Sequence, residues 1–261
     1  MTGTAPRPHR DRSATAPAPP WPTRRAGVHS RSMKLPPDIG LPTDAWYRLP
    51  LATALERIAE RAELAEIYSA DDHSLLAAAN RHAALASGLQ LTVHGPHDDL
   101  EPGSLRERDR RHAVQVHRRH LEAAAEIGAL TYVVHPDYSG CAIPRDARVV
   151  DALQHTFAEL EELQRELGLI LDTGHAAICG TLHDFLNEPH AELAHVHLHD
   201  SRGPADAGDP HLPLGRGIVD AGAVVRRTRQ SGARIILELL DETAIAESVA
   251  YLERRGIVSP V

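Results

Sequence analysis

Short apolar segments alternate with longer amphipathic segments along most of this 261-residue chain. The apolar segments have the length of strands buried on both faces, whereas the segments between them repeat apolar residues at helical spacing. Alternation of this kind is typical of βα units, in which successive strands are parallel. The pattern therefore predicts a parallel α/β fold.

Seven strands are predicted, and helices separate them. Thr53 with Glu56 and Ser104 with Glu107 have the spacing of capping boxes, and Asp220 precedes another helix as its expected cap. The predicted strands lie near 34–41, at 64–69, 89–94 and 130–135, in the segments that end at Asp172 and at His197, and at 234–240. The predicted helices lie at 51–62, 73–88, 104–128, 146–167, 182–186, 220–230 and 242–255.

Side chains that bind metals recur where predicted strands end. In a barrel of parallel strands, the carboxyl ends converge on one face, where such enzymes keep their chemistry. In an open, doubly wound sheet these ends would line one edge instead. Five strand ends that carry such side chains favour the barrel. The side chains are His94, His135, Asp172, His197 and Glu238.

Further ligand types follow two of these strand ends closely. His175 comes three residues after Asp172, and Asp209 and His211 lie in the loop that follows His197. Carboxylate and imidazole groups bind hard and borderline divalent cations, and strand ends give them rigid support. The stretch from Leu169 to Gly217 therefore indicates a metal site.

Two patterns bear on the interior of the predicted barrel. Glu238 interrupts a run of apolar residues, and a buried carboxylate costs several kcal/mol unless a cation or a partner compensates it. His195, His197 and His199 alternate along one strand and therefore point to one face. A metal-lined interior fits this alternation, and a polar interior satisfied by water fits it too. Histidines in helical patterns are expected at the surface, namely His82, His112, His117, His120 and His155.

The first 32 residues differ from the rest of the chain. They contain six prolines, six arginines and a single acidic residue, and they have no apolar periodicity. We expect residues 1–32 to be a disordered tail and residues 33–261 to form one metal-binding domain. Met33 is the only methionine besides Met1 and stands where the ordered pattern begins, so translation starting at Met33 is plausible.

The charge of the remaining chain argues against binding to long nucleic acids. Without the tail, 22 basic and 35 acidic residues give a net charge of −13, which repels a phosphate backbone. Aromatic residues make up 3% of the chain and offer few platforms for base stacking. No apolar run approaches 18 residues, so we expect a soluble protein without a membrane partner, cytoplasmic by default. Neither a nucleotide-binding glycine loop nor a GxSxG elbow is present.

Six short motifs, in chain order, resemble those of the xylose isomerase-like TIM-barrel superfamily. They read HGP at 94–96, VVHP at 133–136, LDTGH at 171–175, HLHD at 197–200, DPHLPLGRG at 209–217 and LELL at 237–240. The superfamily includes sugar-phosphate isomerases and epimerases and the zinc phosphodiesterases of the endonuclease IV type. The resemblance covers roughly residues 34–256, and it implies a TIM-type (β/α) barrel with metal bound at its C-terminal rim.

The resemblance also implies a set of metal ligands. The isomerases commonly use one divalent ion, held by residues that correspond to Asp172, His197 and Glu238. We therefore expect a divalent cation as cofactor, either zinc, manganese or magnesium. The residues that fall on metal-ligand positions of the trinuclear zinc members are His94, His135, Asp172, His175, His197, Asp209, His211 and Glu238.

One metal-binding glutamate of the superfamily is missing from this sequence. It belongs at a strand end between those of His135 and Asp172, which are only 37 residues apart, about the length of one βα unit. The superfamily places two units there. We therefore predict a barrel that lacks one βα unit and has about seven strands. Glu66, on the second predicted strand, could replace the missing ligand, although a polar residue of the barrel interior is an equally good interpretation.

These residues predict a divalent-metal-dependent isomerase or epimerase of a sugar or sugar phosphate. Asp172, His197 and Glu238 would be the catalytic residues: the ion would polarise an oxygen atom, and a carboxylate would move a proton between adjacent carbons. Glu238 would have to serve both purposes. A zinc phosphodiesterase acting on a small phosphoester is an alternative, favoured by Asp209 and His211. A degenerate, non-catalytic family member and a truncated gene model are two further alternatives.

Overall fold

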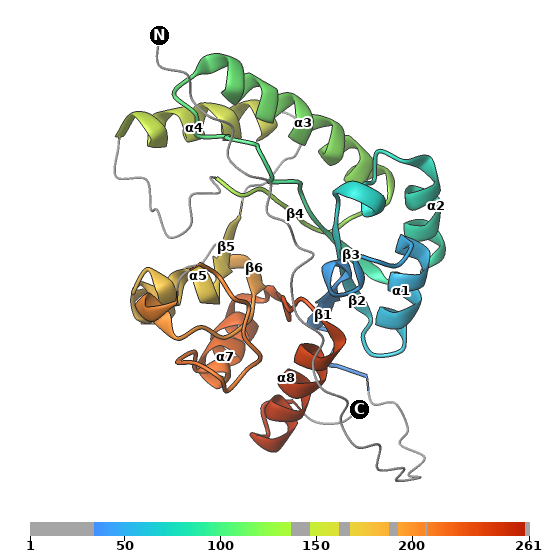
Figure 1. The fold of residues 1–261 in the computed structure, drawn as a ribbon, viewed down its shortest axis with the longest axis vertical. Helices are drawn as coiled ribbons and strands as arrows, with labels where there is room; N and C mark the ends of the chain where they lie inside the picture. The colour runs from blue at the N-terminus through green and yellow to red at the C-terminus, as the bar shows by residue number, and fades with distance from the viewer. Residues whose placement is uncertain (1–33, 137–146, 162–167, 188–192, 207, 259–261) are drawn as a thin grey trace, which may run out of the picture. The chain divides into compact units, whose positions relative to one another are not determined.

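Seven parallel strands form the centre of the molecule, in a computed structural model that describes residues 34–136, 147–161, 168–187, 193–206 and 208–258. The strands are hydrogen-bonded in the order β4-β3-β2-β1-β7-β6-β5 (Figure 1). Their bounds are β1 Ile39–Pro42, β2 Leu64–Tyr68, β3 Gln90–His94, β4 Tyr132–Val133, β5 Leu169–Asp172, β6 Leu193–His197 and β7 Arg234–Ile236.

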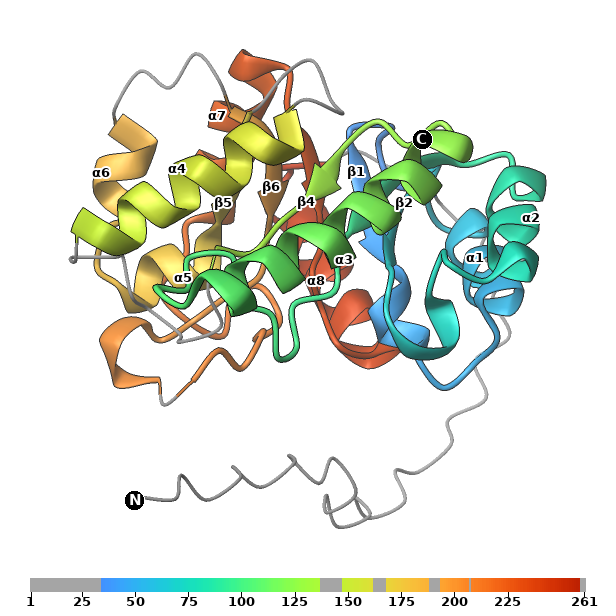
Figure 2. The same ribbon diagram turned by 90° about the horizontal axis from the view of Figure 1, so that it is seen from above.

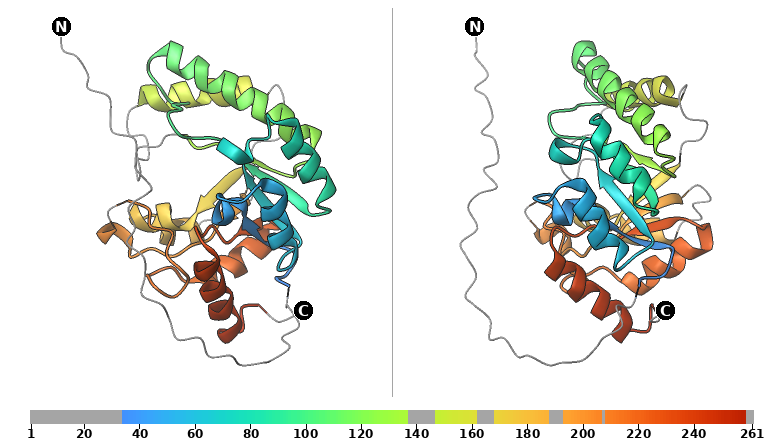
Figure 3. Two further views of the ribbon diagram at one scale, coloured as in Figure 1. Left: turned by 45° about the vertical axis from the view of Figure 1, so that its right-hand side comes forward. Right: turned by 90° about the vertical axis from the view of Figure 1, so that its right-hand side faces the viewer.

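Helices cover the outside of these strands, as the views in Figures 2 and 3 show. The long helix α3 lies beside α4, and α1 packs against α2. The α-helices are α1 Leu51–Ala59, α2 Ala78–Ala86, α3 Glu107–Glu126, α4 Ala147–Glu161, α5 Thr173–Ile178, α6 Leu182–Asn187, α7 Ala221–Ser231 and α8 Glu242–Arg254. Short 3-10 helices are η1 Thr43–Trp46, η2 Asp71–His73 and η3 Gly203–Ala205.

The strands make a nearly closed barrel because β1 joins the two halves of the chain. β1 pairs with β2, where Leu41 lies opposite Ala65, and with β7, where Ile39 lies opposite Ile235. β4 and β5 are the two ends of the sheet, and within the described segments no pairing joins them. This gap lies between the strands of His135 and Asp172, so the prediction of seven strands with one unit missing there is confirmed.

The most completely buried part of the core lies around β1, β2 and β7. Ile39, Leu41, Ile67 and Ile235 have no exposed surface. Removing such side chains from water stabilises the fold by about 1.5–3 kcal/mol each. The strands that carry Glu66 and lead to Glu238 therefore lie in the most completely buried part of the core.

Two expected helix caps are wrong, and the start of one helix differs from the prediction. α1 begins at Leu51, directly after Pro50, and α3 begins at Glu107, after Arg106, so Thr53 and Ser104 do not act as caps. A proline with φ of −55° already has a dihedral angle compatible with a helix, which lets α1 begin two residues before Thr53. The predicted cap at Asp220 is confirmed, since its carboxylate accepts a hydrogen bond from Ala223 N at 3.0 Å.

The prediction that helical histidines lie at the surface is wrong for two of them. His117 and His120 of α3 are 1% and 4% exposed. His117 Nδ1 lies 3.0 Å from the Tyr132 hydroxyl, and His120 Nδ1 lies 2.9 Å from Ser69 Oγ, so both imidazoles have partners inside the protein. Within the described residues, no helix is both long and apolar enough to cross a membrane.

Candidate metal centre

Three neighbouring strands deliver acidic and imidazole side chains to one rim of the barrel. Asp172 is the last residue of β5 and His197 the last of β6, while His199 and Glu238 stand two residues beyond the ends of β6 and β7. The strand pairing continues past these ends, because Leu198 N donates to Ile236 O and Glu238 N donates to Leu198 O. The backbone therefore holds these side chains at a common level.

His197 stands between two carboxylates. Its Nε2 lies 2.8 Å from Glu66 Oε1, and its Nδ1 lies 3.1 Å from Glu238 Oε2 and 4.0 Å from Asp172 Oδ2. These are ion-pair contacts rather than in-line hydrogen bonds. His197 is fully buried, so both contacts act in an environment of low dielectric constant.

A second set of contacts lies around Asp172 and His199. His199 Nε2 is 3.1 Å from Asp172 Oδ1 and 3.8 Å from Glu238 Oε2. The Asp172 carboxylate also caps α5 by accepting a hydrogen bond from His175 N at 2.8 Å. Gly174 permits this arrangement, because a Cβ atom there would lie 2.0 Å from Cε1 of His199. The glycine of the LDTGH motif is therefore needed for the close approach of α5 to His199.

The loop after β6 adds Asp209 and His211. Asp209 Oδ2 lies 3.3 Å from His175 Nε2, and His211 Nε2 lies 3.5 Å from Glu238 Oε2. The ring of His211 stacks on that of His199, with centroids 4.2 Å apart. This loop is therefore folded onto the strand ends.

Asp200 fixes the returning part of the loop. Its fully buried carboxylate accepts four backbone hydrogen bonds, from the amides of Ser201, Gly215, Gly217 and Val219, at 2.8–3.0 Å. The Asp200 backbone also exchanges two hydrogen bonds with Leu212, next to His211. These bonds determine where His211 stands.

His94 and His135 complete the group from β3 and β4. The ring of His94 stacks on that of His197 with centroids 5.5 Å apart, and it lies 4.9 Å from the ring of His135. His94 Nδ1 lies 2.8 Å from Gly95 O and must donate to this carbonyl, which leaves Nε2 as the nitrogen with a free lone pair. The ring of His135 lies 6.0 Å from that of His175.

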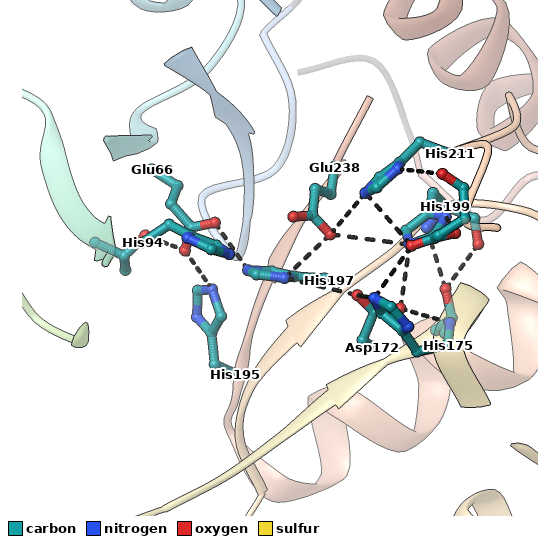
Figure 4. A network of polar contacts seen from close by, with 12 residues as sticks. Glu66, His94, Asp172, His175, His195, His197, His199, His211 and Glu238 are labelled. Atoms are coloured by element: carbon teal, nitrogen blue, oxygen red, sulfur yellow. Dashed lines mark hydrogen bonds and ion pairs between the residues drawn. The ribbon is translucent and has the colours of Figure 1, made fainter. Parts of the chain in front are cut away.

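All eight residues predicted as metal ligands therefore lie together. Among the described residues, four groups of three place their ligand atoms within 4.8 Å of one another. Glu238, His197 and His199 each belong to two groups, so the groups form one continuous cluster (Figure 4). The groups are Glu66, His195 and His197; His94, His197 and Glu238; His199, His211 and Glu238; and Asp172, His199 and Asp209.

The charges of the cluster are arranged as alternating anions and cations. Burial opposes the charged form of His197, but the Glu238 and Glu66 carboxylates raise its pKa well above the usual range. Burial likewise opposes charge on His211, while contact with Glu238 raises its pKa to about 10. In return His197 and His211 lower the pKa of Glu238 well below its ordinary value, against the effect of burial. Protons on the imidazoles thus compensate the carboxylates.

Several buried atoms of the cluster have no hydrogen-bond partner in the described part of the chain. They are Glu238 Oε2, both carboxylate oxygens of Asp209, both ring nitrogens of His197, and Nδ1 of His195 and of His199. Buried polar atoms normally have partners, and a divalent cation would satisfy carboxylate oxygens and imidazole nitrogens together. The donor set therefore fits a metal ion.

Two residues have a larger part in the site than the sequence indicated. His199 contacts three carboxylates, and its alternation with His197 was the available signal. Glu66 does reach the cluster, but it lies beside His195 and His197, away from Asp172. In Figure 4, Glu66, His94 and His195 lie on one side of His197, and Glu238, Asp172, His175, His199 and His211 lie on the other.

Comparison with known proteins agrees with this fold. Residues 152–255 match the family model described as Xylose isomerase-like TIM barrel. A D-tagatose 3-epimerase-like protein superposes with a TM-score of 0.71 over 83% of this chain and 96% of its own, at 23% identity. The 3-keto-D-glucoside 4-epimerase of E. coli does so with a TM-score of 0.65 over 84% and 100%, at 19% identity.

Similar sequences include two curated proteins of low identity. An uncharacterized protein of Methanocaldococcus jannaschii is 25% identical over 225 residues, which are 74% of this chain and 87% of that protein. A probable endonuclease 4 of Mycobacterium leprae is 26% identical over 247 residues, covering 79% and 94% of the two chains. Residues 152–255 therefore match the family that the motifs predicted, and the fold of the chain is similar to that of solved sugar epimerases.

Proposed function

We propose that the protein is a divalent-metal-dependent isomerase or epimerase of a small sugar or sugar phosphate. The observation that carries the proposal is the position of Glu238. Its Oε2 lies 3.1–3.8 Å from nitrogens of His197, His211 and His199, is buried, and has no hydrogen-bond partner among the described residues. A carboxylate placed in this way can both bind a cation and accept a proton.

Asp172, His197 and Glu238 would hold the ion. Carboxylate and imidazole ligands suit zinc or manganese, and magnesium would require more oxygen ligands than this set supplies. When bound, the ion would act as a Lewis acid on a carbonyl or hydroxyl oxygen of the sugar.

Glu238 would move the proton. Its carboxylate would take a proton from the carbon next to the substrate carbonyl and return it to the carbonyl carbon. The hydroxyl proton of the first carbon would move to the carbonyl oxygen, so that the carbonyl and hydroxyl groups change places. A single carboxylate acts on one face of the substrate, so this geometry favours isomerisation. Epimerisation needs an acid on the opposite face, and Asp209, whose two oxygens have no hydrogen-bond partner among the described residues, is the residue that we would test for this role.

Hydrogen exchange with solvent tests the proposal on many sugars at once. The metal-loaded protein is incubated in D2O with free and phosphorylated aldoses and ketoses, and deuterium on carbon is measured by NMR. We expect exchange next to the carbonyl of at least one sugar, and a loss of at least about 100-fold in Glu238→Gln. Glu247→Gln is the matched control, because Glu247 pairs with Arg216 on the surface. A metal-loaded wild type that exchanges none of the sugars would refute the proposal.

A zinc phosphoester hydrolase is a second candidate. The groups built on His199 with His211 and on Asp209 offer room for more than one ion, and clustered cations stabilise the charge of phosphoryl transfer. The probable endonuclease 4 among the relatives supports the same candidate. Two or three ions per chain, together with hydrolysis of a simple phosphodiester such as bis(p-nitrophenyl) phosphate, would favour the hydrolase over the isomerase.

A further inference from the structure

Glu66 is a buried carboxylate that the proposed reaction does not use. It lies on β2 and is 1% exposed. Its Oε2 accepts hydrogen bonds from His195 Nε2 at 2.8 Å and from the Thr92 hydroxyl at 3.2 Å, and its Oε1 lies 2.8 Å from His197 Nε2. Both oxygens are thus engaged within the barrel interior.

Both contacts of 2.8 Å join an imidazole nitrogen to a carboxylate oxygen of Glu66: that of His195 is a hydrogen bond, and that of His197 is an ion pair whose N–H is not in line with the oxygen. Two lone pairs at that distance would repel each other, so each nitrogen must carry a hydrogen. A zinc ion between a nitrogen and an oxygen would also need more space. Two ligand atoms that each lie about 2.0–2.1 Å from a tetrahedral ion are about 3.3 Å from each other. Glu66 therefore meets the N–H sides of His195 and His197.

The opposite nitrogen of His197 faces the cation site. Nδ1 lies 3.1 Å from Glu238 Oε2, and the ring separates Glu66 from Glu238 (Figure 4). Glu66 consequently cannot bind the same ion as Glu238, and it does not take the place of the missing strand-end glutamate.

We propose that Glu66 is a positioning residue of the metal centre: by pairing with Nε2 of His197 it keeps Nδ1 of that ring turned to Glu238 and to the bound cation. This inference rests on the proposed metal site. Carboxylates that orient a metal-binding imidazole raise its basicity, and their loss typically weakens metal affinity by about 10- to 100-fold. His195 Nε2, 2.8 Å from Oε2, holds Glu66 itself in place from the other side.

Zinc affinity provides the first test. The dissociation constant for Zn²⁺ alone is measured by competition with a chromophoric chelator in wild type, Glu66→Gln and Thr92→Val. We expect about 10- to 100-fold weaker binding in Glu66→Gln. Thr92→Val removes another hydrogen-bond partner of Glu66 but leaves its contact with His197, so its affinity should stay within about threefold. Equal losses in both variants, or none in Glu66→Gln, would overturn the inference.

Nitrogen-15 NMR of the histidine rings provides the second test, and it needs no variant at Glu66. The His197 resonances are assigned by their absence in His197→Gln. In the zinc-loaded wild type we expect a protonated Nε2 and a metal-bound Nδ1 on His197. Coordination through Nε2, as for an ion between Glu66 and His197, would contradict the inference even if Glu66→Gln does not fold. A wild type that binds no zinc would refute the metal site and this inference together, whereas the outcomes above refute this inference alone.

Discussion

Asp200→Asn should destabilise the protein strongly although it changes only one atom. The carboxylate of Asp200 accepts four backbone N–H bonds, two on each oxygen. An asparagine oxygen can accept two of them, and its amide group then points two N–H donors at the remaining two. Each buried donor left without an acceptor costs about 1–3 kcal/mol, so we expect a loss of about 4 kcal/mol.

The assay is thermal or chemical unfolding of the metal-free protein. For a domain of this size, about 4 kcal/mol corresponds to a fall in Tm of roughly 8–16 °C. Asp220→Asn is the matched control, because it makes the same substitution at an exposed helix cap. Asparagine caps a helix about as well as aspartate, so the Tm should hardly change. A Tm of Asp200→Asn within about 2 °C of wild type would refute the reasoning that four bonds converge on this carboxylate.

Two further predictions concern stability at residues outside the proposed metal site. Burial, with a smaller effect of Arg119, lowers the pKa of His120 to about 4, so the unfolded chain binds a proton there below about pH 6.5 while the native protein does not. The free energy of unfolding should therefore fall as pH drops from 7 to 5. Chemical unfolding should show that His120→Gln reduces this fall by about 2 kcal/mol, and an equal fall in the variant and in wild type would contradict the prediction. Gly217→Ala would place a Cβ 2.1 Å from Ser201 O and should lower stability by more than about 2 kcal/mol, whereas Gly222→Ala, inside α7, should cost little; equal Tm values for the two variants would contradict this.

The periodicity of the sequence predicts the strand count and the position of the gap, because strand-end motifs recur at the length of one βα unit and one interval is too short. It also predicts that the ligand residues meet, since parallel strands deliver their ends to one rim. The helical pattern around His117 also indicates that this residue is buried. It shares a helical stripe with Ala113, Val114 and Leu121, all of which are buried in α3.

Other features depend on contacts that no local pattern records. Glu66 meets His195 across 129 positions of the chain, and only the closure of β2 against β1 and of β1 against β7 brings them together. We propose that the contact of Glu66 with His197 Nε2 decides which nitrogen of His197 faces the site. The cap of α1 differs from the predicted one because Pro50 precedes the helix without a side-chain cap, while Thr53 of the expected capping box lies inside the helix.

The central claim is that side chains from separate strand ends share one divalent cation, and metal content tests it most directly. The protein is loaded with zinc or manganese, freed of excess metal by gel filtration, and measured by elemental analysis. We expect at least one ion per wild-type chain and a loss of most of it in the double variant His197→Gln with Glu238→Gln, with the single surface variant Glu247→Gln as control. Wild-type protein that retains no metal, or a double variant that retains the full amount, would contradict the account.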